Sequence, residues 1–176
     1  MISLTTARLN MQSIQEQDWP LFLSLYQSPA VMRFIGELDT PEQIRCRFEQ
    51  RLGEWNKYAD FWLSLVIREQ STGVAVGLTG FFPAWQTYKQ AEVGFILHPE
   101  FHGKGYATES LREVMNFAFK ICGFHRLQAN VLEGNMSSRR VLEKSGFQLE
   151  GCLRESYCIG GKWHNDWLLG CLAKDI

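Results

Sequence analysis

The stretch PEFHGKGYATE, residues 99–109, is the most informative part of the sequence. It follows a strand-like segment that Pro99 ends, and it leads directly into a helix-like segment. Glycines at positions 103 and 105 let the backbone turn tightly and approach a ligand closely. Consecutive backbone N–H groups at a helix N-terminus also form a nest for anionic oxygens. We therefore predict that this loop binds a phosphate group, with a plain strand-to-helix turn as the alternative.

Two common phosphate-binding motifs do not match this stretch. A Walker A loop needs Ser or Thr directly after its lysine, whereas Lys104 is followed by Gly105. The dinucleotide-binding pattern GxGxxG needs a third glycine where this chain has Thr108. A pyrophosphate held by backbone N–H groups is the ligand that the loop suits best.

Apolar periodicity on both sides of the loop predicts a mixed order of strands and helices. The helix after the loop has one apolar face, made of Leu111, Met115, Ala118, Phe119 and Cys122. Strands are expected at residues 8–14, 61–68, 74–82, 91–97, 126–132, 147–156 and 162–172, and further helices at 18–26, 41 to about 55, and 137–145. A central mixed sheet with helices on both faces, an α/β (α+β) fold, accommodates this order.

Local signals mark where several of these elements begin and end. Asp18 is expected to cap the first helix. Thr40, with Gln43 three residues later, predicts a capping box at the second helix. Gly146 is a natural C-cap for the last helix, and the pair at 160–161 predicts a tight hairpin turn.

Length and composition favour one ordinary globular domain over residues 1–176. A formal net charge of −1 gives no general attraction to nucleic acid or to an anionic membrane, and no apolar run approaches the roughly 18 residues of a membrane span. Five cysteines without a CxxC pair suggest reduced thiols, and neither they nor His98 and His102 suggest a metal site. We expect a cytoplasmic protein without a metal.

A second motif makes the phosphate loop more specific. Asn135, with Ser138 three residues on, can simply cap a helix. Together with the loop, however, the pair resembles the Gcn5-related N-acetyltransferase superfamily over nearly the whole chain. The segment Gly146-Phe147, residues 150–153 and the pair Trp163-His164 look like the branch that acetylates the N-termini of ribosomal proteins. The resemblance implies a mostly antiparallel central sheet with a V-shaped splay between two central strands.

The resemblance also implies a binding site for acetyl-coenzyme A. The family's pyrophosphate loop matches at His102, Gly105 and Ala107, although His102 replaces the usual Gln or Arg. The Asn135 segment would lie along the pantetheine arm, whose amides would pair with free main-chain groups of the strand before the loop. The implied binding residues are Ile96, Leu97, His98, His102, Gly103, Lys104, Gly105, Tyr106, Ala107, Asn135 and Ser138.

Acetyl transfer to an amine requires a base, because only the neutral amine attacks a thioester. Glu92, an acidic residue within an apolar strand beside the implied slot, is the first candidate; the alternative is a solvated residue or a core ion pair. Ser138 is the candidate acid for the leaving sulfur, with Tyr106 and Tyr157 as rivals. Some close relatives in the family carry a glutamate base at about the position of Tyr157; this chain has no acid there, and Glu155, two residues earlier, is the rival base.

The predicted acceptor is the N-terminal α-amine of a protein, and of a ribosomal protein by the resemblance. An α-amine with a pKa near 8 is roughly a tenth neutral at pH 7, whereas lysine is far less so. The alternatives are a small amine, such as a polyamine, amino sugar or amino acid, and a coenzyme A-binding sensor without turnover. Phe34, Trp55, Trp85 and Tyr88 could line an acceptor pocket, although positions in the core or on a partly covered surface are more common for such residues. Final strands of such folds often pair, so a homodimer is a further expectation.

Overall fold

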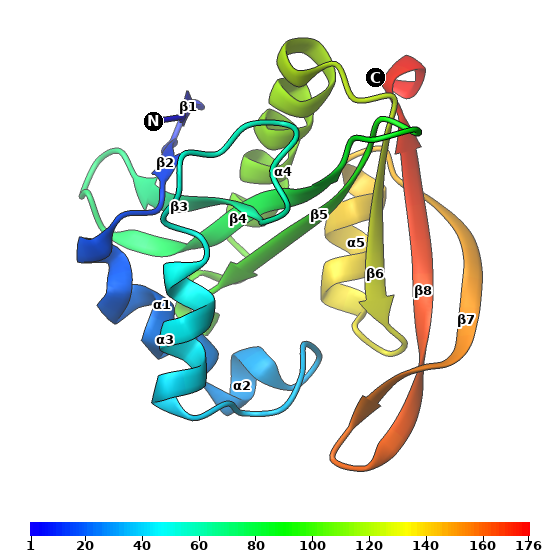
Figure 1. Ribbon diagram of the computed structural model, residues 1–176, viewed down its shortest axis with the longest axis horizontal. Coiled ribbons are helices and arrows are strands. Elements are labelled where there is room, and N and C mark those ends of the chain that lie inside the picture. The colour runs from blue at the N-terminus through cyan, green and yellow to red at the C-terminus, as the bar shows by residue number, and fades with distance from the viewer.

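The computed structural model describes all 176 residues, which build around one eight-stranded sheet (Figure 1). Its strands, in spatial order, are β1 (Ser3–Thr5), β2 (Leu9–Ser13), β3 (Leu63–Glu69), β4 (Ala75–Ala84), β5 (Gln90–Leu97), β6 (Arg126–Leu132), β8 (Lys162–Leu172) and β7 (Gln148–Ile159). Every neighbouring pair is antiparallel except β5–β6, which is parallel. The mixed, mostly antiparallel sheet is therefore confirmed.

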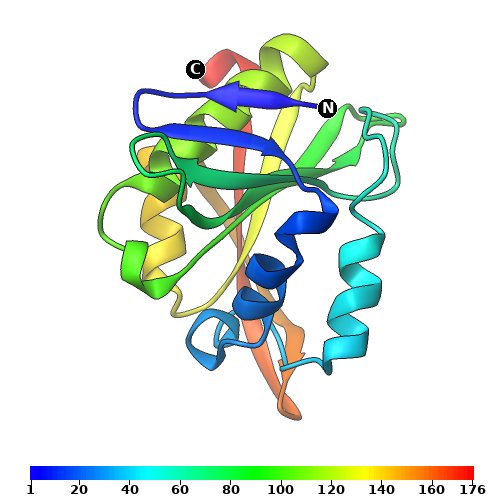
Figure 2. The same cartoon turned by 90° about the vertical axis from the view of Figure 1, so that its left-hand side faces the viewer.

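Helices cover both faces of the sheet, as expected (Figure 2). One face carries α1 (Trp19–Tyr26), α2 (Pro29–Met32) and α3 (Pro41–Glu49), and the other carries α4 (Tyr106–Asn116), its π-helical continuation η3 (Phe117–Cys122) and α5 (Met136–Lys144). Two apolar cores follow, of 25 buried residues beneath α4 and of 10 beneath α1 and α3. All five predicted apolar residues of the α4–η3 face are buried.

The capping box at α3 is confirmed, but the helix ends earlier than expected. Gln43 N–H donates to the Thr40 hydroxyl at 3.3 Å, and the Gln43 side chain accepts from Thr40 N–H at 2.8 Å. The helix stops at Glu49 and does not continue to residue 55. Phe48 packs in the smaller core, whereas Trp55 packs against Phe81 in the larger one. The chain must leave the helix to bring Trp55 to that other core.

The expected cap at Asp18 is wrong. Its carboxylate does not bond the first turn of α1. It accepts instead from Gln15 N–H at 2.9 Å and pairs with Arg68 of β3. Asp18 is only 5% exposed. A buried carboxylate without a charged partner costs more free energy than an uncapped helix end, so the pair with Arg68 is favoured.

The short and irregular elements depart most from the expectations. Strand β1 and helix α2 have three and four residues, which is too few to produce a periodic pattern. Strand β7 runs three residues past position 156, beyond a register shift that contains Glu155 at a φ of +48°. The Gly160-Gly161 turn is confirmed, with positive φ at both residues. None of the helices combines the length and apolar character needed to cross a bilayer.

Candidate active site

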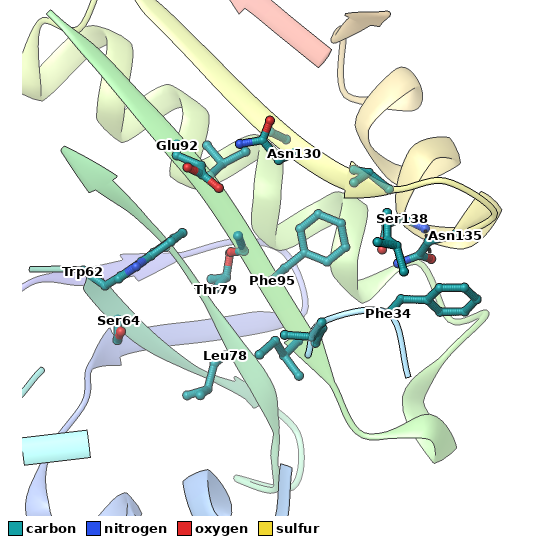
Figure 3. Close-up of a pocket in the computed structure, with 18 of the residues that line it drawn as sticks. Phe34, Trp62, Ser64, Leu78, Thr79, Glu92, Phe95, Asn130, Asn135 and Ser138 are labelled. Carbon is teal, nitrogen blue, oxygen red and sulfur yellow. Dashed lines mark hydrogen bonds between the residues drawn. The ribbon is translucent and has the colours of Figure 1, made fainter. Parts of the chain in front are cut away.

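The splay between β5 and β6 creates the site. The two strands pair only over Gln90–Glu92 and Arg126–Gln128. Beyond that point β6 pairs with β8 on its other side, and β5 continues beside β4. The diverging ends open into a cavity of about 560 Å³ that runs from α5 across the sheet to α3 (Figure 3).

One edge of β5 faces this slot with unpaired main-chain groups. His98 N–H donates to Val76 O of β4 at 3.0 Å. The expectation that His98 offers a free main-chain N–H is therefore wrong. In an antiparallel strand the main-chain N–H and C=O groups of every second residue face the same neighbouring strand. Those of Ile96 therefore also face β4. Of the three expected residues only Leu97 faces the slot, together with Phe95. The Leu97 carbonyl accepts a hydrogen bond from the His102 ring at 3.0 Å, which leaves its N–H for a ligand.

The glycine loop next to the slot forms an anion nest. Gly103 and Gly105 have φ of 76° and 82°, which L side chains rarely adopt. Gly105 occupies the N-cap of α4, whose first intrahelical bond runs from Glu109 N–H to Gly105 O at 3.0 Å. The N–H groups of the first turn, from Tyr106 onward, therefore have no helical partner. They point out of the N-terminal end of the helix, where an anion such as a pyrophosphate can bind.

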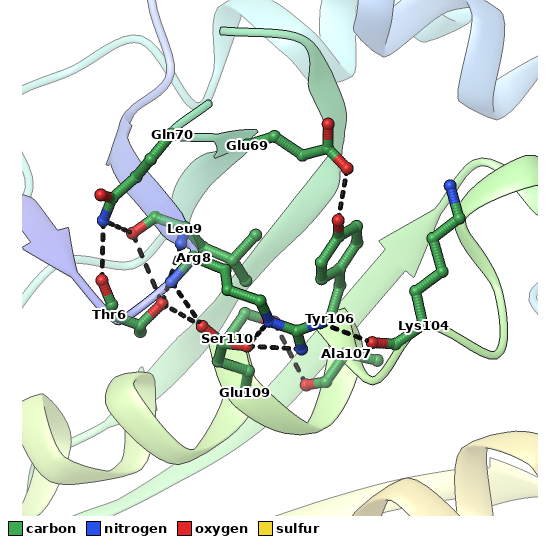
Figure 4. A network of polar contacts seen from close by, with 10 residues as sticks. All are labelled: Thr6, Arg8, Leu9, Glu69, Gln70, Lys104, Tyr106, Ala107, Glu109 and Ser110. Carbon is green, nitrogen blue, oxygen red and sulfur yellow. Dashed lines mark hydrogen bonds and ion pairs between the residues drawn. The ribbon is translucent and has the colours of Figure 1, made fainter. Parts of the chain in front are cut away.

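An ion pair behind the loop fixes its position (Figure 4). The Arg8 guanidinium pairs with Glu109 at 2.6 Å and donates to the Lys104 carbonyl at 3.0 Å. It also lies over the Tyr106 ring, 4.7 Å from the centroid. One side chain immediately before β2 thus holds both the loop and the first turn of α4.

Helix α5 begins at the far wall of the slot. Ser138 N–H donates to the Asn135 side-chain oxygen at 3.2 Å, so Asn135 caps the helix. Both side chains also line the cavity, near Phe34 (Figure 3). No hydrogen bond occupies the Ser138 hydroxyl among the described contacts, and it can therefore serve a ligand.

Glu92 lies where the strands separate. Burial raises the pKa of Glu92 above its ordinary value; a hydrogen bond from Asn130 opposes that rise, and the charge of Asp166 adds to it. Figure 3 shows Glu92 and Asn130 directed toward one another from β5 and β6. A half-buried carboxylate with a raised pKa is a better proton acceptor near neutral pH than an ordinary surface glutamate.

The rival residues lie in other surroundings. Tyr106 donates its hydroxyl hydrogen to Glu69, and this bond raises the pKa of Tyr106. Tyr157 does line the cavity and donates to Ile35 O at 2.7 Å. Glu155 is exposed in the β7 bulge and is not among the lining residues. Tyr157 is therefore the rival that the fold brings to the cavity.

The two histidines and the four candidate pocket aromatics also lie in different surroundings. The His98 ring lies 3.1 Å from the Ser24 hydroxyl, while that of His102 bonds to the backbone. Of the four aromatic residues, only Phe34 lines the cavity. Trp55 and Trp85 pack in the larger core, and Tyr88 is exposed.

Sequence reasoning missed the residues that complete the cavity. They are Tyr26, Arg47, Arg51, Trp62, Asn130 and Asp166. They come from four elements and two loops, and none belongs to a local motif. To find them, one would have to know which face of each strand α1–α3 cover, and that requires the three-dimensional fold.

Comparisons with known proteins agree with this geometry. The acetyltransferase (GNAT) domain family matches residues 8–148. An uncharacterized N-acetyltransferase of Bacillus subtilis, YoaA, is 31% identical over 86% of each chain. A spermidine N(1)-acetyltransferase of Escherichia coli is 26% identical over 76% of each.

Solved structures show the same fold. A spermidine N-acetyltransferase from Vibrio cholerae in complex with CoA and spermine has a TM-score of 0.83 at 19% identity, covering 97% of this chain and 98% of its own. RimL, a ribosomal L7/L12 alpha-N-protein acetyltransferase in complex with coenzyme A, has a TM-score of 0.82 at 18% identity, with the same coverage. The open β5 edge and the loop nest suit the same cosubstrate. The chain belongs to the GNAT family of acetyltransferases and is an acetyl-CoA-dependent N-acetyltransferase.

Proposed function

We propose that the enzyme acetylates the α-amine of a peptide or protein N-terminus, with ribosomal proteins as the class that the sequence resemblance favours. The observation that carries the proposal is Glu92, a glutamate with a raised pKa in a cavity that continues into the cosubstrate slot. A base of this kind suits an amine whose pKa is near 8. Lysine would require roughly 3 kcal/mol more deprotonation work at neutral pH.

Acetyl-CoA supplies the acetyl group as a thioester, and the chain supplies its position. The unpaired N–H groups of the loop from Gly103 to Ala107 would hold the pyrophosphate. Leu97 and the Asn135–Ser138 segment would hold the pantetheine arm. This places the thioester at the closed end of the slot, where β5 and β6 begin to pair and Glu92 lies.

The residues of the cavity divide the proton transfers between them. Glu92 accepts a proton from the attacking amine, directly or through water. A slot-facing N–H of β5 can stabilise the developing oxyanion. The Ser138 hydroxyl can donate to the departing sulfur, with Tyr157 as the alternative donor on the same cavity.

A small polyamine is the second candidate acceptor. The relative named spermidine N(1)-acetyltransferase supports it, because its 26% identity extends over 76% of the chain. A peptide and a polyamine both present a primary amine, so they must be separated by experiment.

The test is a competition between two peptides, each with an internal lysine, one with a free and one with a blocked N-terminus. Mass spectrometry after incubation with acetyl-CoA locates the added acetyl group. Acetylation confined to the free N-terminus supports the proposal. Comparable modification of the blocked peptide contradicts it, and reaction of spermidine alone establishes the second candidate. Unchanged acetyl-CoA with every acceptor would favour a coenzyme A sensor.

A further inference from the structure

Arg51 brings a guanidinium without a carboxylate partner into the cavity. It follows α3, is half-buried, and lines the cavity beside Trp62 and Ser64. Its Nη1 donates to the Ser64 hydroxyl at 3.3 Å, and no ion pair of the chain includes it. Arg47, the other arginine of the cavity, is neutralised by Asp39 at 2.6 Å. Most of the five N–H donors of Arg51 are therefore free for a ligand.

Aromatic rings hold this guanidinium in place. Its Cζ lies 5.3 Å from the ring centroid of Phe22 and 5.8 Å from those of Tyr26 and Trp62. These contacts stabilise the cation but offer no acceptor to its N–H groups. A planar guanidinium fixed against rings is well suited to bind a carboxylate through two parallel hydrogen bonds.

The sheet surface between Arg51 and the reacting centre consists of Ser64, Gly80 and Gly94, and the Trp62 ring lies over Gly94. Ser64 pairs with Gly80 of β4, and Gly80 pairs with Gly94 of β5. A Cβ added at Gly94 would meet the Trp62 ring at 3.1 Å. The corridor for the acceptor would run along the Trp62 ring, and the separation from Ser64 to Gly94 is two strand spacings, about 10 Å. Glu92 lies two residues from Gly94 on the same face of β5.

We propose that Arg51 binds a carboxylate of the acceptor, about 10 Å from the amine that is acetylated. The proposal rests on the proposed function, because it places the reacting amine beside Glu92. An extended peptide advances about 3.3–3.6 Å per residue. The carboxylate therefore belongs to an Asp or Glu side chain at the second or third residue of the acceptor peptide.

This arrangement also selects against other amines. A polyamine has no carboxylate, and its second cationic group would meet the charge of Arg51 in a partly buried site. The carboxylate of a free α-amino acid lies too close to its own amine to span the corridor. An acidic peptide N-terminus satisfies both Glu92 and Arg51.

The experiment compares kcat/KM for peptides that differ only in Glu or Gln at position 2, 3 or 6. The enzymes are the wild type, Arg51→Met, and Arg45→Met as the control. Arg45 lies on α3 and is paired with Glu16 and Glu49 outside the cavity lining, so its replacement removes the same charge. Methionine keeps much of the apolar stem of arginine, which preserves packing.

We expect the wild type to prefer Glu over Gln at position 2 or 3 by roughly 10- to 100-fold, as a charge-assisted hydrogen bond provides. Arg51→Met should lose that preference, so that its kcat/KM values for the Glu and Gln peptides become equal, and a melting curve like that of the wild type shows that it is folded. Arg45→Met should keep the preference.

Equal rates with Glu and Gln peptides, or an equal preference at position 6, would overturn the subsite while the proposed function stands. Absence of acetylation on every peptide would overturn both.

Discussion

Glu92, Gly94 and Ile96 lie on the same face of β5, which α1–α3 cover. Their neighbours give these residues different roles. Gly94 leaves space for the Trp62 ring, and Ile96 packs against the smaller core. Glu92 is the member of the set at the point where β6 separates, so its carboxylate is buried beside an open slot. The proposed role of Glu92 as the base follows from this position, and an acidic residue within an apolar strand was the one sign of it in the sequence.

Replacing Glu92 tests its role as the base. We expect Glu92→Gln to lower kcat by on the order of 10²-fold with little change in coenzyme affinity. The base must be ionised, and its pKa is raised. The acidic limb of the wild-type pH–rate profile should therefore lie above the ordinary glutamate range, and the variant should lack it. Glu155→Gln should keep the wild-type profile. Wild-type rates in Glu92→Gln from about pH 6 to 9 would rule this base out.

The same substitution has an expected effect on stability. A raised pKa in the folded state means that ionisation of Glu92 costs folding free energy. That cost is absent below the ordinary glutamate pKa and develops as pH rises through the raised value. Glu92→Gln should therefore melt a few degrees higher than the wild type at pH 7, and the difference should vanish in acid. An unchanged melting temperature at pH 7 would show that burial of Glu92 carries no such cost.

Elements could be predicted where the residues that specify them are close together in the sequence. The Thr40 box, the Asn135 cap and the glycine loop each specify local backbone geometry. The end of α3 could not be predicted, because the destination of Trp55 in the larger core decides it. Nothing in the residues after position 52 indicates that Trp55 packs in the larger core.

The loop before α4 is held in place by Arg8, which lies outside both the loop and the helix. Arg8→Met removes the ion pair to Glu109 and the bond to the Lys104 carbonyl. Exposed pairs of this kind contribute about 1 kcal/mol or less to folding. We expect a small loss of stability but a several-fold weaker affinity for coenzyme A, because the nest loses its fixed geometry. Calorimetry checks the affinity, with Arg45→Met as the control. Equal affinities would mean that the glycines alone fix the loop.

The composition of the cavity depends on the fold of the whole molecule and not on any single element. Trp62, Glu92, Asn130 and Asp166 are separated by many residues, and the strand order with its single parallel pair brings them to one cavity. The general fold could be predicted from periodicity and resemblance. The place where β5 and β6 part, and hence the acceptor side of the site, required the register of the sheet.

Packing of the whole chain also predicts the reactivity of its thiols. Burial raises the pKa of Cys122 and of Cys171 to about 11 in each case, whereas Cys46, Cys152 and Cys158 are exposed. Reactivity requires an accessible thiolate. Iodoacetamide at about pH 8 should modify the three exposed cysteines of the native enzyme, and all five only in denaturant. Rapid labelling of all five in the native state would contradict the packing described.

The slot between β5 and β6, with the 103–107 loop at its mouth, is the proposed binding site for the cosubstrate. Calorimetric titration of coenzyme A into the wild type and Gly105→Glu tests it most directly. A Cβ at position 105 would meet Nη2 of Arg8 at 3.3 Å on a backbone with a φ of 82°, so a glutamate there would displace Arg8 and distort the loop that is proposed to hold the pyrophosphate. Gly161→Glu, at the hairpin tip with a φ of 75° against 82° at Gly105, introduces the same residue at a similarly strained site. We predict that binding is abolished in Gly105→Glu and retained in Gly161→Glu; unchanged affinity in a folded Gly105→Glu variant would contradict the account.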